Sequence, residues 1–562
     1  MTDTPRPLHP ALQRLLEKRG LAGKDAQDFL SWNLKDIPDL TQMHDMTKAA
    51  ERLVLAMERN EKIAVYGDYD VDGTTSCALL WHFFKMLGHK IDVFQPSRFV
   101  EGYGIHPVSI DNALAENVKV LISVDCGISN TETADYAASR DLDLIITDHH
   151  RDAAPHIPRA FAVVNPNRRD EPEDSPLRAL AGVGVAFALA VKVRELLLAK
   201  GQQVASLYPL LPFVAIGTIC DLAVLTPVNL RLSRHGLKQI PTCAYPGILQ
   251  FFAPEELAAG VTSEKVSFNI GPMINSKGRL DHPERSLKLL IAESRDEARE
   301  HYQHLEISNR DRRIIQAEVV EGAKEEVLKN IREDMIVNVV YRPDWHEGVV
   351  GIVASKLVDA FSVPAVVLTN AEEPGVIKGS ARSAGELNIF DCLEQCKDLF
   401  LKFGGHKAAA GLSLKKENLP EFQRRLRTII AAVPEVLRTR ADRWDVELTP
   451  DEINPQLVRD LQHLEPFGNG NERPVFRMSG VKLASYRILK DAHVRWTFSP
   501  AKNPQQTLAG ISFHYLGKWN QPGPDEVFQK QAQMPFTLQF GLGINRFNGN
   551  ESIQLQVDKI II

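Results

Sequence analysis

The chain has 562 residues, which predicts three or four domains at about 150 residues per domain. Hydrophobic residues make up 44% and charged residues 25%, so the composition excludes a disordered, collagen-like or coiled-coil chain. The formal net charge of -6 excludes a uniformly basic nucleic-acid-binding protein. It does not exclude a local basic groove, because a global sum says nothing about where the charges lie.

The sequence carries no recognisable signal for export or membrane insertion. Its first ten residues are polar and proline-rich, and no run of about 18 apolar residues occurs. Six cysteines are too few for a disulfide framework in a chain of this length. We therefore expect a cytoplasmic protein without a membrane span, and a monomer, since no oligomerisation segment is recognisable.

The first half of the chain predicts an α/β domain behind an N-terminal helical extension. Residues 1–45 are polar and helical in pattern, and residues 46–290 alternate short apolar runs with amphipathic stretches. We expect strands at residues 63–66, 118–124, 142–147 and 161–164. Continuous apolar strands separated by helices are typical of a parallel sheet that is covered on both faces.

A long polar stretch follows at residues 294–329, rich in Glu and Arg and free of proline. As a single helix, these 36 residues would extend roughly 54 Å. We therefore expect a connecting helix within residues 291–332 that joins two domains. Two shorter surface helices are an equally compatible interpretation.

The remaining sequence predicts two further domains. Residues 333–438 form a second α/β domain, with strands at 336–340 and 363–368 around a helix at 350–358. Residues 439–562 contain five short alternating strands between Gly, Pro and Asn turns, which favours a small β-barrel of the OB type. We expect these strands at residues 481–486, 493–498, 507–513, 536–542 and 553–559.

An acidic turn follows the first strand. Asp68, Asp70 and Asp72 lie between Gly67 and Gly73. Three carboxylates within five residues repel one another unless cations hold them together. A solvated acidic turn or a calcium loop is the alternative, but the EF-hand spacing would require a glutamate where leucine stands.

Further acidic groups end the next strands. Asp125 follows the second strand, and Asp148, His149 and His150 follow the third. In open α/β sheets ligands bind at the carboxyl ends of the strands, so we expect these side chains to meet. A single aspartate there is more often a helix cap, but three groups in consecutive units favour a site. Asp221, within an apolar run, is a natural further ligand.

Carboxylate oxygens with one or two imidazoles suit Mg²⁺ or Mn²⁺ better than structural zinc. Two such ions about 3.5–4 Å apart can activate a water molecule and stabilise the leaving oxygen of a phosphate ester. The sequence therefore predicts metal-assisted phosphoryl hydrolysis.

These motifs also carry a family resemblance. DYDVDG, VDCG, TDHH and CDLA resemble four successive motifs of the DHH phosphoesterase superfamily, and Gly404-Gly405-His406 resembles the motif of the DHH-associated domain. Together with the C-terminal barrel, the pattern is similar to the RecJ family of single-strand-specific 5′→3′ exonucleases. The resemblance extends from about residue 46 to the end of the chain.

The resemblance implies a role for each residue of the site. Asp70, Asp72, Asp125, His149 and Asp221 would be ligands of two Mn²⁺ or Mg²⁺ ions, with Asp125 bridging. Four more would serve catalysis around them: Asp68 and Asp148 by orienting ligands or water, and His150 and His406 by contacting phosphate. The expected substrate-binding residues are Arg98, Tyr103, Arg279, Ser380, Arg382, Gly404, Gly405, Trp496 and Arg546.

Physical reasons support part of this set. Arginine forks can grip phosphates bidentately, although an isolated arginine is usually a surface charge. Aromatic rings interleaved with cations, as at Trp496 and Arg546, can stack bases of a single strand in an OB fold. The same rings could instead fill the core of the barrel, and that alternative is equally compatible with the sequence.

We expect an exonuclease that releases 5′-mononucleotides from single-stranded DNA and acts in mismatch repair, recombinational repair and the processing of stalled forks. The resemblance implies single-strand-binding protein and a RecQ-type helicase as partners. Two alternatives are a DHH phosphatase acting on small phosphorylated substrates and a non-catalytic scaffold that binds single-stranded DNA.

Overall fold

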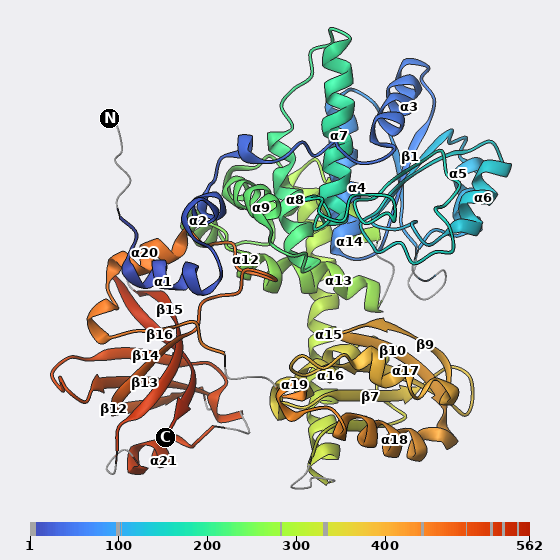
Figure 1. Ribbon diagram of the computed structural model, residues 1–562. Helices are drawn as coiled ribbons and strands as arrows, with labels where there is room; N and C mark the ends of the chain where they lie inside the picture. The colour runs from blue at the N-terminus through green and yellow to red at the C-terminus, as the bar shows by residue number, and fades with distance from the viewer. Residues whose placement is uncertain are drawn as a thin grey trace. The chain divides into compact units, whose positions relative to one another are not determined.

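Figure 1 shows the computed structural model of the chain, in which the described residues are 7–96, 102, 104–280, 284–329, 335–439, 443–490, 492–517, 521–530, 534–547 and 550–562. Side chains are not described at residues 277–280, 517, 546, 547 and 550. Four of the predicted substrate-binding side chains therefore lie outside the described residues, those of Arg98, Tyr103, Arg279 and Arg546.

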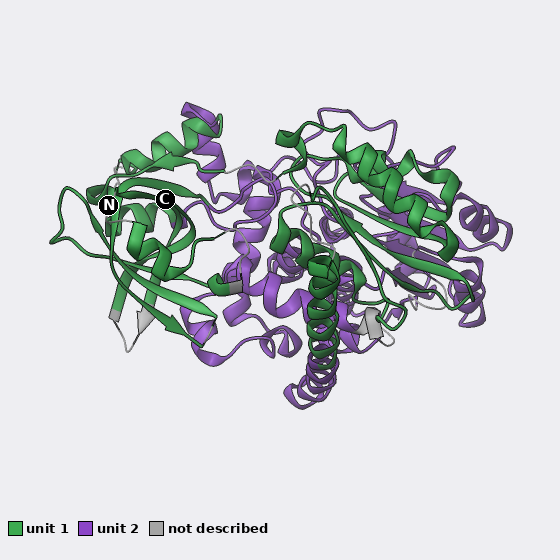
Figure 2. Cartoon of the chain, turned by 90° about the horizontal axis from the view of Figure 1, so that it is seen from below, with its two compact units in different colours: residues 1–20, 311–461, 474–562 green, residues 21–310, 462–473 purple. Residues whose placement is uncertain are grey.

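The chain forms two compact units (Figure 2). Unit 1 comprises residues 1–20, 311–461 and 474–562, and unit 2 comprises residues 21–310 and 462–473. The segment predicted as one N-terminal extension is thus shared between the units. Helix α1 (Pro10–Lys18) belongs to unit 1, where Lys18 Nζ donates a hydrogen bond to the carbonyl oxygen of Trp444 at 2.7 Å.

Unit 2 is built on a parallel sheet with the strand order β2-β1-β3-β4-β5. Its strands are β1 (Ile63–Gly67), β2 (Asp92–Phe94), β3 (Val120–Val124), β4 (Asp143–Thr147) and β5 (Ala162–Val164). The four strands expected from apolar runs are confirmed to within a few residues. The short edge strand β2 was missed, since it offers only three residues, all partly exposed.

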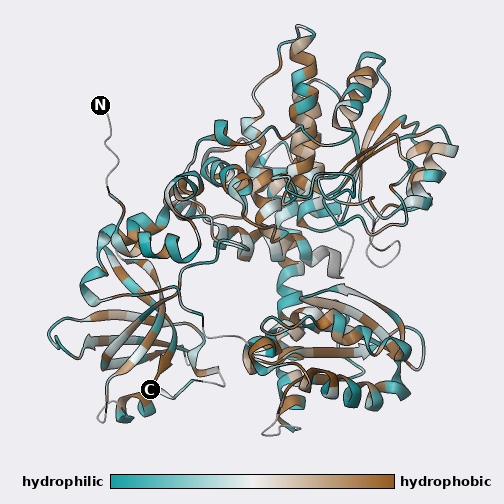
Figure 3. Cartoon of the chain, viewed as in Figure 1, coloured by the Kyte–Doolittle hydropathy of each residue, from teal (hydrophilic) through white to brown (hydrophobic). Residues whose placement is uncertain are grey.

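Both faces of this sheet are buried, as the continuous apolar strands predicted. In β1, Ile63 and Val65 contribute to one hydrophobic core while Ala64 and Tyr66 contribute to the other. Figure 3 colours these strands mostly brown, which marks them as hydrophobic. Successive side chains of a strand point to opposite faces, so covering both faces requires apolar residues at every position.

Unit 2 contains a set of helices besides its sheet. Helix α4 (Val71–Met86) begins after the acidic turn that follows β1 and is buried along most of its length. The others are α2 (Gly23–Leu30), α3 (Met46–Glu58), α5 (Pro107–Ala115), α6 (Thr131–Ser139), α7 (Gly182–Ala199), α8 (Leu211–Cys220), α9 (Pro227–Gln239), α10 (Pro246–Leu249), α11 (Pro254–Ala259), α12 (Ser263–Lys265), α13 (Gly271–Leu280) and α14 (Glu284–Ile291).

The polar stretch that follows is one continuous helix, α15 (Arg295–Lys329), of 35 residues. The single-helix interpretation of residues 294–329 is confirmed, and the alternative of two shorter helices is wrong. The chain passes from unit 2 to unit 1 within α15, at residue 311.

Unit 1 contains a mixed sheet with the strand order β6-β7-β8-β10-β9. Its strands are β6 (Asn338–Tyr341), β7 (Ala365–Asn370), β8 (Val376–Arg382), β9 (Phe400–His406) and β10 (Ala409–Lys415). The helices along this part of the chain are α16 (Val350–Phe361), α17 (Ile389–Glu394), α18 (Leu419–Ala431) and α19 (Glu435–Arg438). Only β6 and β7 were expected, because β8, β9 and β10 are interrupted by glycine and polar residues.

The C-terminal sheet has the strand order β11-β12-β13-β14-β16-β15. Its strands are β11 (Val446–Glu447), β12 (Phe476–Leu489), β13 (His493–Pro500), β14 (Leu508–Ser512), β15 (Phe536–Phe547) and β16 (Asn550–Ile561), and its helices are α20 (Pro455–Gln462) and α21 (Pro524–Lys530). Strand β15 also pairs with β12, so the hydrogen-bonded pairings return to β12. Such closure of five strands fits the predicted OB fold.

Candidate metal centre

The acidic turn between β1 and α4 carries the first carboxylates of the candidate metal centre. Asp70 caps helix α4, and its Oδ1 accepts a hydrogen bond from the Gly73 amide at 3.0 Å. A Cβ at Gly73 would stand 2.4 Å from the carbonyl oxygen of Asp68, so the turn can close only around glycine. The backbone fold of this turn therefore brings Asp68 and Asp70 to the carboxyl end of β1.

The neighbouring strands contribute the other predicted ligands. Asp125 follows β3 with a φ of 59°, a left-handed conformation that costs a non-glycine residue roughly 1 kcal/mol or more. Such strain persists where surrounding contacts fix the residue, and it clusters at functional sites. Asp148 and His149 follow β4, so the carboxyl ends of three strands supply the cluster, as predicted.

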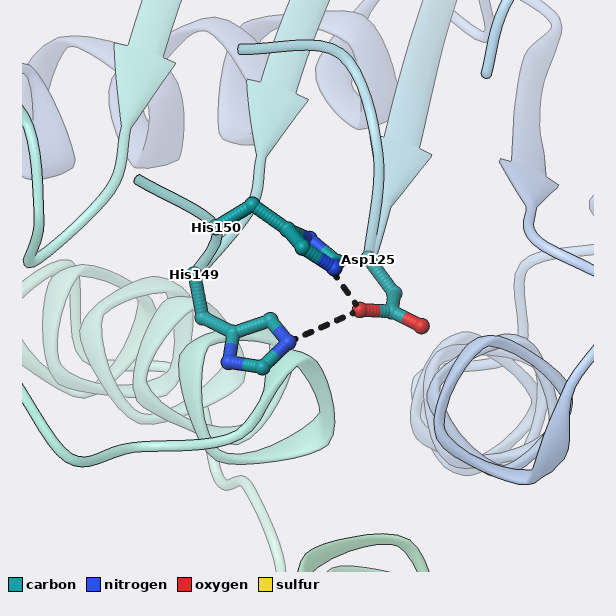
Figure 4. Close-up of side chains that lie close together, drawn as sticks. All are labelled: Asp125, His149 and His150. Carbon is teal, nitrogen blue, oxygen red and sulfur yellow. Dashed lines mark ion pairs between the residues drawn. The ribbon is translucent and has the colours of Figure 1, made fainter. Parts of the chain in front are cut away.

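Ligand atoms from these elements converge. His149 Nε2 lies 3.2 Å from Asp125 Oδ1, 3.8 Å from Asp72 Oδ2 and 3.9 Å from Asp221 Oδ2. Figure 4 shows the imidazoles of His149 and His150 directed at the Asp125 carboxylate, which His150 Nδ1 approaches to 3.9 Å.

Three groups with ligand atoms within 4.8 Å of one another could each hold a metal ion among the described residues. They are Asp125–His149–His150, Asp72–His149–Asp221 and Asp68–Asp70–Asp125. The structure thus brings together seven of the eight residues predicted in unit 2 as cation ligands or catalytic residues, and the eighth, Asp148, contacts His150.

Helix α7 fixes Asp72, a feature that sequence reasoning missed. The amides of Gly182 and Val183, at the start of α7, donate hydrogen bonds to the Asp72 carboxylate at 2.6 Å and 2.9 Å. A Cβ at Gly182 would stand 2.8 Å from the Cβ of Asp125. The glycines of Ala181-Gly182-Val183-Gly184 were the available signal, since free amides at a helix N-terminus bind anions.

Two asparagines after β5 were missed as well. Asn165 Nδ2 donates to the carbonyl oxygen of His150 at 2.9 Å, and Asn167 Nδ2 donates to that of His149 at 2.6 Å. They fix the backbone that carries both imidazoles. The Asn-Pro-Asn sequence directly after a buried strand was the signal that could have identified them.

The carboxylates of the centre disfavour one another's charge. Burial, followed by the charges of Asp221 and Asp70, raises the pKa of Asp72 well above its usual value. Burial and the charge of Asp72 do the same for Asp125, and burial and Asp70 raise the pKa of Asp221 to about 7. A cluster of this kind is ionised together only when cations offset the repulsion.

The two histidines differ in charge. Burial and the neighbouring His150 lower the pKa of His149 to about 4, which leaves a neutral imidazole of the kind that binds metals. Burial opposes the charge of His150, but its 2.8 Å hydrogen bond to Asp148 prevails and raises its pKa to about 9. The raised pKa favours the cationic form of His150, which would strengthen a contact with phosphate.

The donor set fits divalent cations. Asp68, Asp72 and Asp125 are at most 3% exposed, and His149 Nε2 is buried without a hydrogen bond to a described residue. Carboxylate oxygens in excess over imidazoles are the ligands of Mg²⁺ and Mn²⁺. The six cysteines are free and none joins the three groups, so a thiolate site is not formed by the described residues.

Four of the residues predicted in unit 1 share one face of its mixed sheet. Arg382 and His406 both pair with Ala409 of β10, and Ser380 and Gly404 both pair with Gly411. Residues directly opposite in antiparallel strands point to the same side, and here it is the more exposed one. Arg382 Nη1 donates to Ser380 Oγ at 2.5 Å, while His406 is exposed at the edge strand β9.

Gly405 lies where only a small residue fits. Its φ is 156°, and a Cβ would stand 2.4 Å from the carbonyl oxygen of Ala409. At Gly404 a Cβ would meet nothing within 4 Å. The close approach of β9 and β10 thus accounts for the second glycine, and Gly404 leaves open space beside His406.

The structure does not support the predicted base-stacking role of Trp496. Its side chain is fully buried, its Nε1 donates to Ser512 Oγ at 2.9 Å, and its ring packs against Phe498 and Tyr515. Trp496 alternates along β13 with exposed residues and points inward, so it fills the core of the OB domain. The alternative that these rings are core residues is correct for Trp496.

The fold and the centre define a protein of the DHH class. A family model described as the DHH family, N-terminal domain, matches residues 62–218, which include every residue of the centre except Asp221. The DHHA1 domain model matches residues 333–432, and the RecJ OB domain model matches residues 444–559.

Two curated relatives identify the family within this class. The single-stranded-DNA-specific exonuclease RecJ of Escherichia coli is 33% identical over 578 residues, which cover 99% of this chain and 97% of the relative. The protein of the same name from Bacillus subtilis is 34% identical over 514 residues, covering 90% of this chain but only 63% of the relative. The chain belongs to the RecJ family.

Solved structures agree with this assignment. The chain matches RecJ from Thermus thermophilus in complex with Mn²⁺, with a TM-score of 0.78 and 26% identity over 98% of this chain and 76% of that one. It also matches the Mg²⁺ complex of the same protein, with a TM-score of 0.73 and 25% identity.

None of the described helices combines the length and hydropathy needed to span a bilayer.

Proposed function

We propose that the chain is a metal-dependent exonuclease that degrades single-stranded DNA from its 5′ end and releases 5′-mononucleotides. The observation that carries this proposal is the convergence of Asp72, Asp125, His149 and Asp221 in a chain whose relatives are named single-stranded-DNA-specific exonucleases. We further propose that the chain acts in mismatch repair, recombinational repair and the processing of stalled forks.

Five side chains would hold the cations, two Mn²⁺ or Mg²⁺ ions: Asp70, Asp72, Asp125, His149 and Asp221. When bound, the ions supply a water of lowered pKa and neutralise charge on the phosphate. Asp125 lies in two of the three groups of ligand atoms, which supports a bridging role. Asp68 shares a group with Asp70 and Asp125, and from there it orients these ligands or the attacking water.

Asp148 and His150 would act as a pair beside the cations. Asp148 Oδ1 accepts hydrogen bonds from His150 Nδ1 and from the amides of His149 and His150, which fixes the orientation of both rings. The hydrogen bond of Nδ1 to Asp148 orients the imidazole of His150, which would contact a phosphate oxygen. The cationic form of His150 strengthens that contact.

The shared face of the mixed sheet would bind the substrate's phosphates. Arg382 presents a guanidinium that Ser380 orients, and His406 lies beside the space at Gly404. None of these three side chains belongs to the three groups of possible cation ligands, so we assign them to substrate binding and, for His406, to contact with the scissile phosphate. We further propose a cytoplasmic monomer that cooperates with single-strand-binding protein and a RecQ-type helicase.

The test compares Asp72→Asn with the exposed control Asp111→Asn. We expect Asp72→Asn to abolish release of mononucleotides from a 5′-phosphorylated single strand, with binding of that strand unchanged in fluorescence anisotropy. The control should cleave normally, and wild-type activity should disappear in EDTA. Normal cleavage by Asp72→Asn would refute the metal assignment. If the wild type preferred a dinucleotide to a long single strand, the proposal that single-stranded DNA is the substrate would be refuted.

A further inference from the structure

The connection between α8 and α9 carries Asp221 in an unusual turn. Asp221 caps α8, and the amides of Leu222 and Ala223 donate to the carbonyl oxygens of Ile219 and Thr218 at 3.3 Å and 3.2 Å. This is the Schellman pattern, which normally has glycine in its left-handed position. Here Leu222 holds that position with a φ of 59° and so pays a conformational cost of about 1 kcal/mol.

Burial of its own side chain does not hold Leu222 in this conformation. The side chains of Leu222 and Val224 are 64% and 45% exposed. A strained conformation persists only where surrounding contacts determine it. Polar contacts therefore help to fix the backbone after Asp221. Asn229 Nδ2 donates to the carbonyl oxygen of Val224 at 2.9 Å, and further contacts come from a distant part of the sequence.

Asn469 supplies two of these contacts. Its Nδ2 donates to the carbonyl oxygen of Leu222 at 2.9 Å, and its own carbonyl oxygen accepts from the amide of Leu225 at 2.8 Å. Asn469 thus holds the connection on both sides of Val224. It belongs to residues 462–473, the segment between α20 and β12 that is part of unit 2.

The segment around Asn469 is shaped to approach this turn closely. A Cβ at Gly468 would stand 2.9 Å from Leu225 Cδ1, and a Cβ at Gly470 would stand 2.7 Å from Val224 Cγ1. Asn471 Nδ2 closes the loop by donating to the carbonyl oxygens of Leu464 and Pro466.

Unit 2 anchors the same loop at both ends. Arg234 donates to the carbonyl oxygens of His463 and Glu465, Ser263 donates to that of Phe467, and Arg473 pairs with Glu264 at 2.9 Å. The loop is thus a fixed element against which the turn can be held.

We propose that Asn469 is a positioning residue for Asp221, which holds the Leu222 turn so that the Asp221 carboxylate faces His149 and Asp72. This inference rests on the proposed function, because it takes Asp221 as a cation ligand. Residues that orient a metal ligand typically change metal affinity about 10–100-fold when they are removed. Asn469 would set the affinity of the centre without touching the cation or the DNA.

The experiment measures Mn²⁺ binding directly, by electron paramagnetic resonance of the free ion, in the full-length protein. For Asn469→Ala we expect Mn²⁺ affinity to fall about tenfold. The KM for a long single strand should be unchanged, and excess Mn²⁺ should restore kcat. Hydrogen exchange at the amides of Leu222 and Ala223 should become faster in the metal-free protein, because the turn opens more often. The matched control is Asn112→Ala on the exposed face of α5.

Two further variants distinguish a failure of the metal assignment from a failure of the positioning role. If Asp221→Asn leaves Mn²⁺ affinity unchanged, Asp221 is not a ligand and the metal assignment fails. If Asp221→Asn weakens Mn²⁺ binding but Asn469→Ala does not, the positioning role is refuted and the metal assignment stands. Asn469→Asp keeps the size of the side chain but presents a carboxylate to the Leu222 carbonyl oxygen. It should therefore weaken Mn²⁺ binding at least as much as Asn469→Ala does. Wild-type Mn²⁺ affinity in Asn469→Asp would overturn the proposal.

Discussion

His82, on the buried helix α4, links the stability of unit 2 to pH. Its Nε2–H donates to the carbonyl oxygen of Leu290 at 3.0 Å, and its ring stacks on Phe213 at 5.2 Å and packs against Tyr245 at 4.6 Å. Burial, reinforced by Lys85, lowers the pKa of His82 from 6.5 to about 4. The ion pair of Lys85 with Glu293 at 2.8 Å partly cancels the effect of Lys85.

The direction in which stability changes with pH follows from proton uptake by His82. Between pH 6.5 and pH 4 the unfolded chain binds the proton and the folded unit does not, so stability falls as the pH is lowered through that window. The full difference of about 2.5 pKa units corresponds to about 3.4 kcal/mol. Between pH 7 and pH 5 the expected loss is about 1.8 kcal/mol, an upper value because the ring is not wholly shielded from water.

The change to make is His82→Gln, which keeps an amide donor for Leu290 but does not titrate. Native-state hydrogen exchange of α4, corrected for the intrinsic rate, gives the free energy of opening at both pH values. We expect the wild type to lose between 1 and 1.8 kcal/mol more than the variant. The exposed His156→Gln should behave as the wild type, and an equal pH dependence in the wild type and His82→Gln would show that the buried imidazole is not responsible.

Arg234 donates from a buried guanidinium to main-chain carbonyl oxygens of four residues, namely Phe29, Ser31, His463 and Glu465. Arg234→Met should therefore lower the free energy of unfolding by about 3 kcal/mol in denaturant titrations, whereas Lys238→Met on the exposed face of α9 should be nearly neutral. Gly73→Ala forces a Cβ against the carbonyl oxygen of Asp68 and should weaken Mn²⁺ binding more than tenfold in calorimetry, with helix content unchanged in circular dichroism. Mn²⁺ at about 100 times its Kd should stabilise the wild type by about 2.7 kcal/mol in thermal unfolding, EDTA should reverse the gain, and Asp72→Asn should show little of it.

The sequence predicted which residues of unit 2 converge because these residues follow apolar runs. Gly67, Val124 and Thr147 each end a buried strand, and the acids come directly after them. Parallel strands bring such ends together whatever lies between them in the sequence. The topology of unit 2 was therefore enough to collect Asp68 to Asp72, Asp125 and His149 at one place.

Other features left no local pattern. The amides of Gly182 and Val183 act through the backbone, so their side chains do not reveal that they bind Asp72. Whether a ring such as Trp496 stacks on a ligand or fills a core depends on which face of β13 it occupies, and that requires the strand register. Asn469 is separated from Asp221 by more than two hundred residues, a contact that periodicity cannot predict.

The two compact units are built from alternating segments of the chain, and this affects what is lost when the OB domain is removed. A chain cut before residue 444, where the match to the OB domain begins, would lose the partner of Lys18 and also the segment at residues 462–473 that closes on the α8–α9 connection. Helix α1 would expose Leu12 and Leu15, which are fully buried in the intact chain. A truncated enzyme would thus be altered in solubility and at the metal centre, and its weaker activity would not measure DNA binding by the lost domain alone.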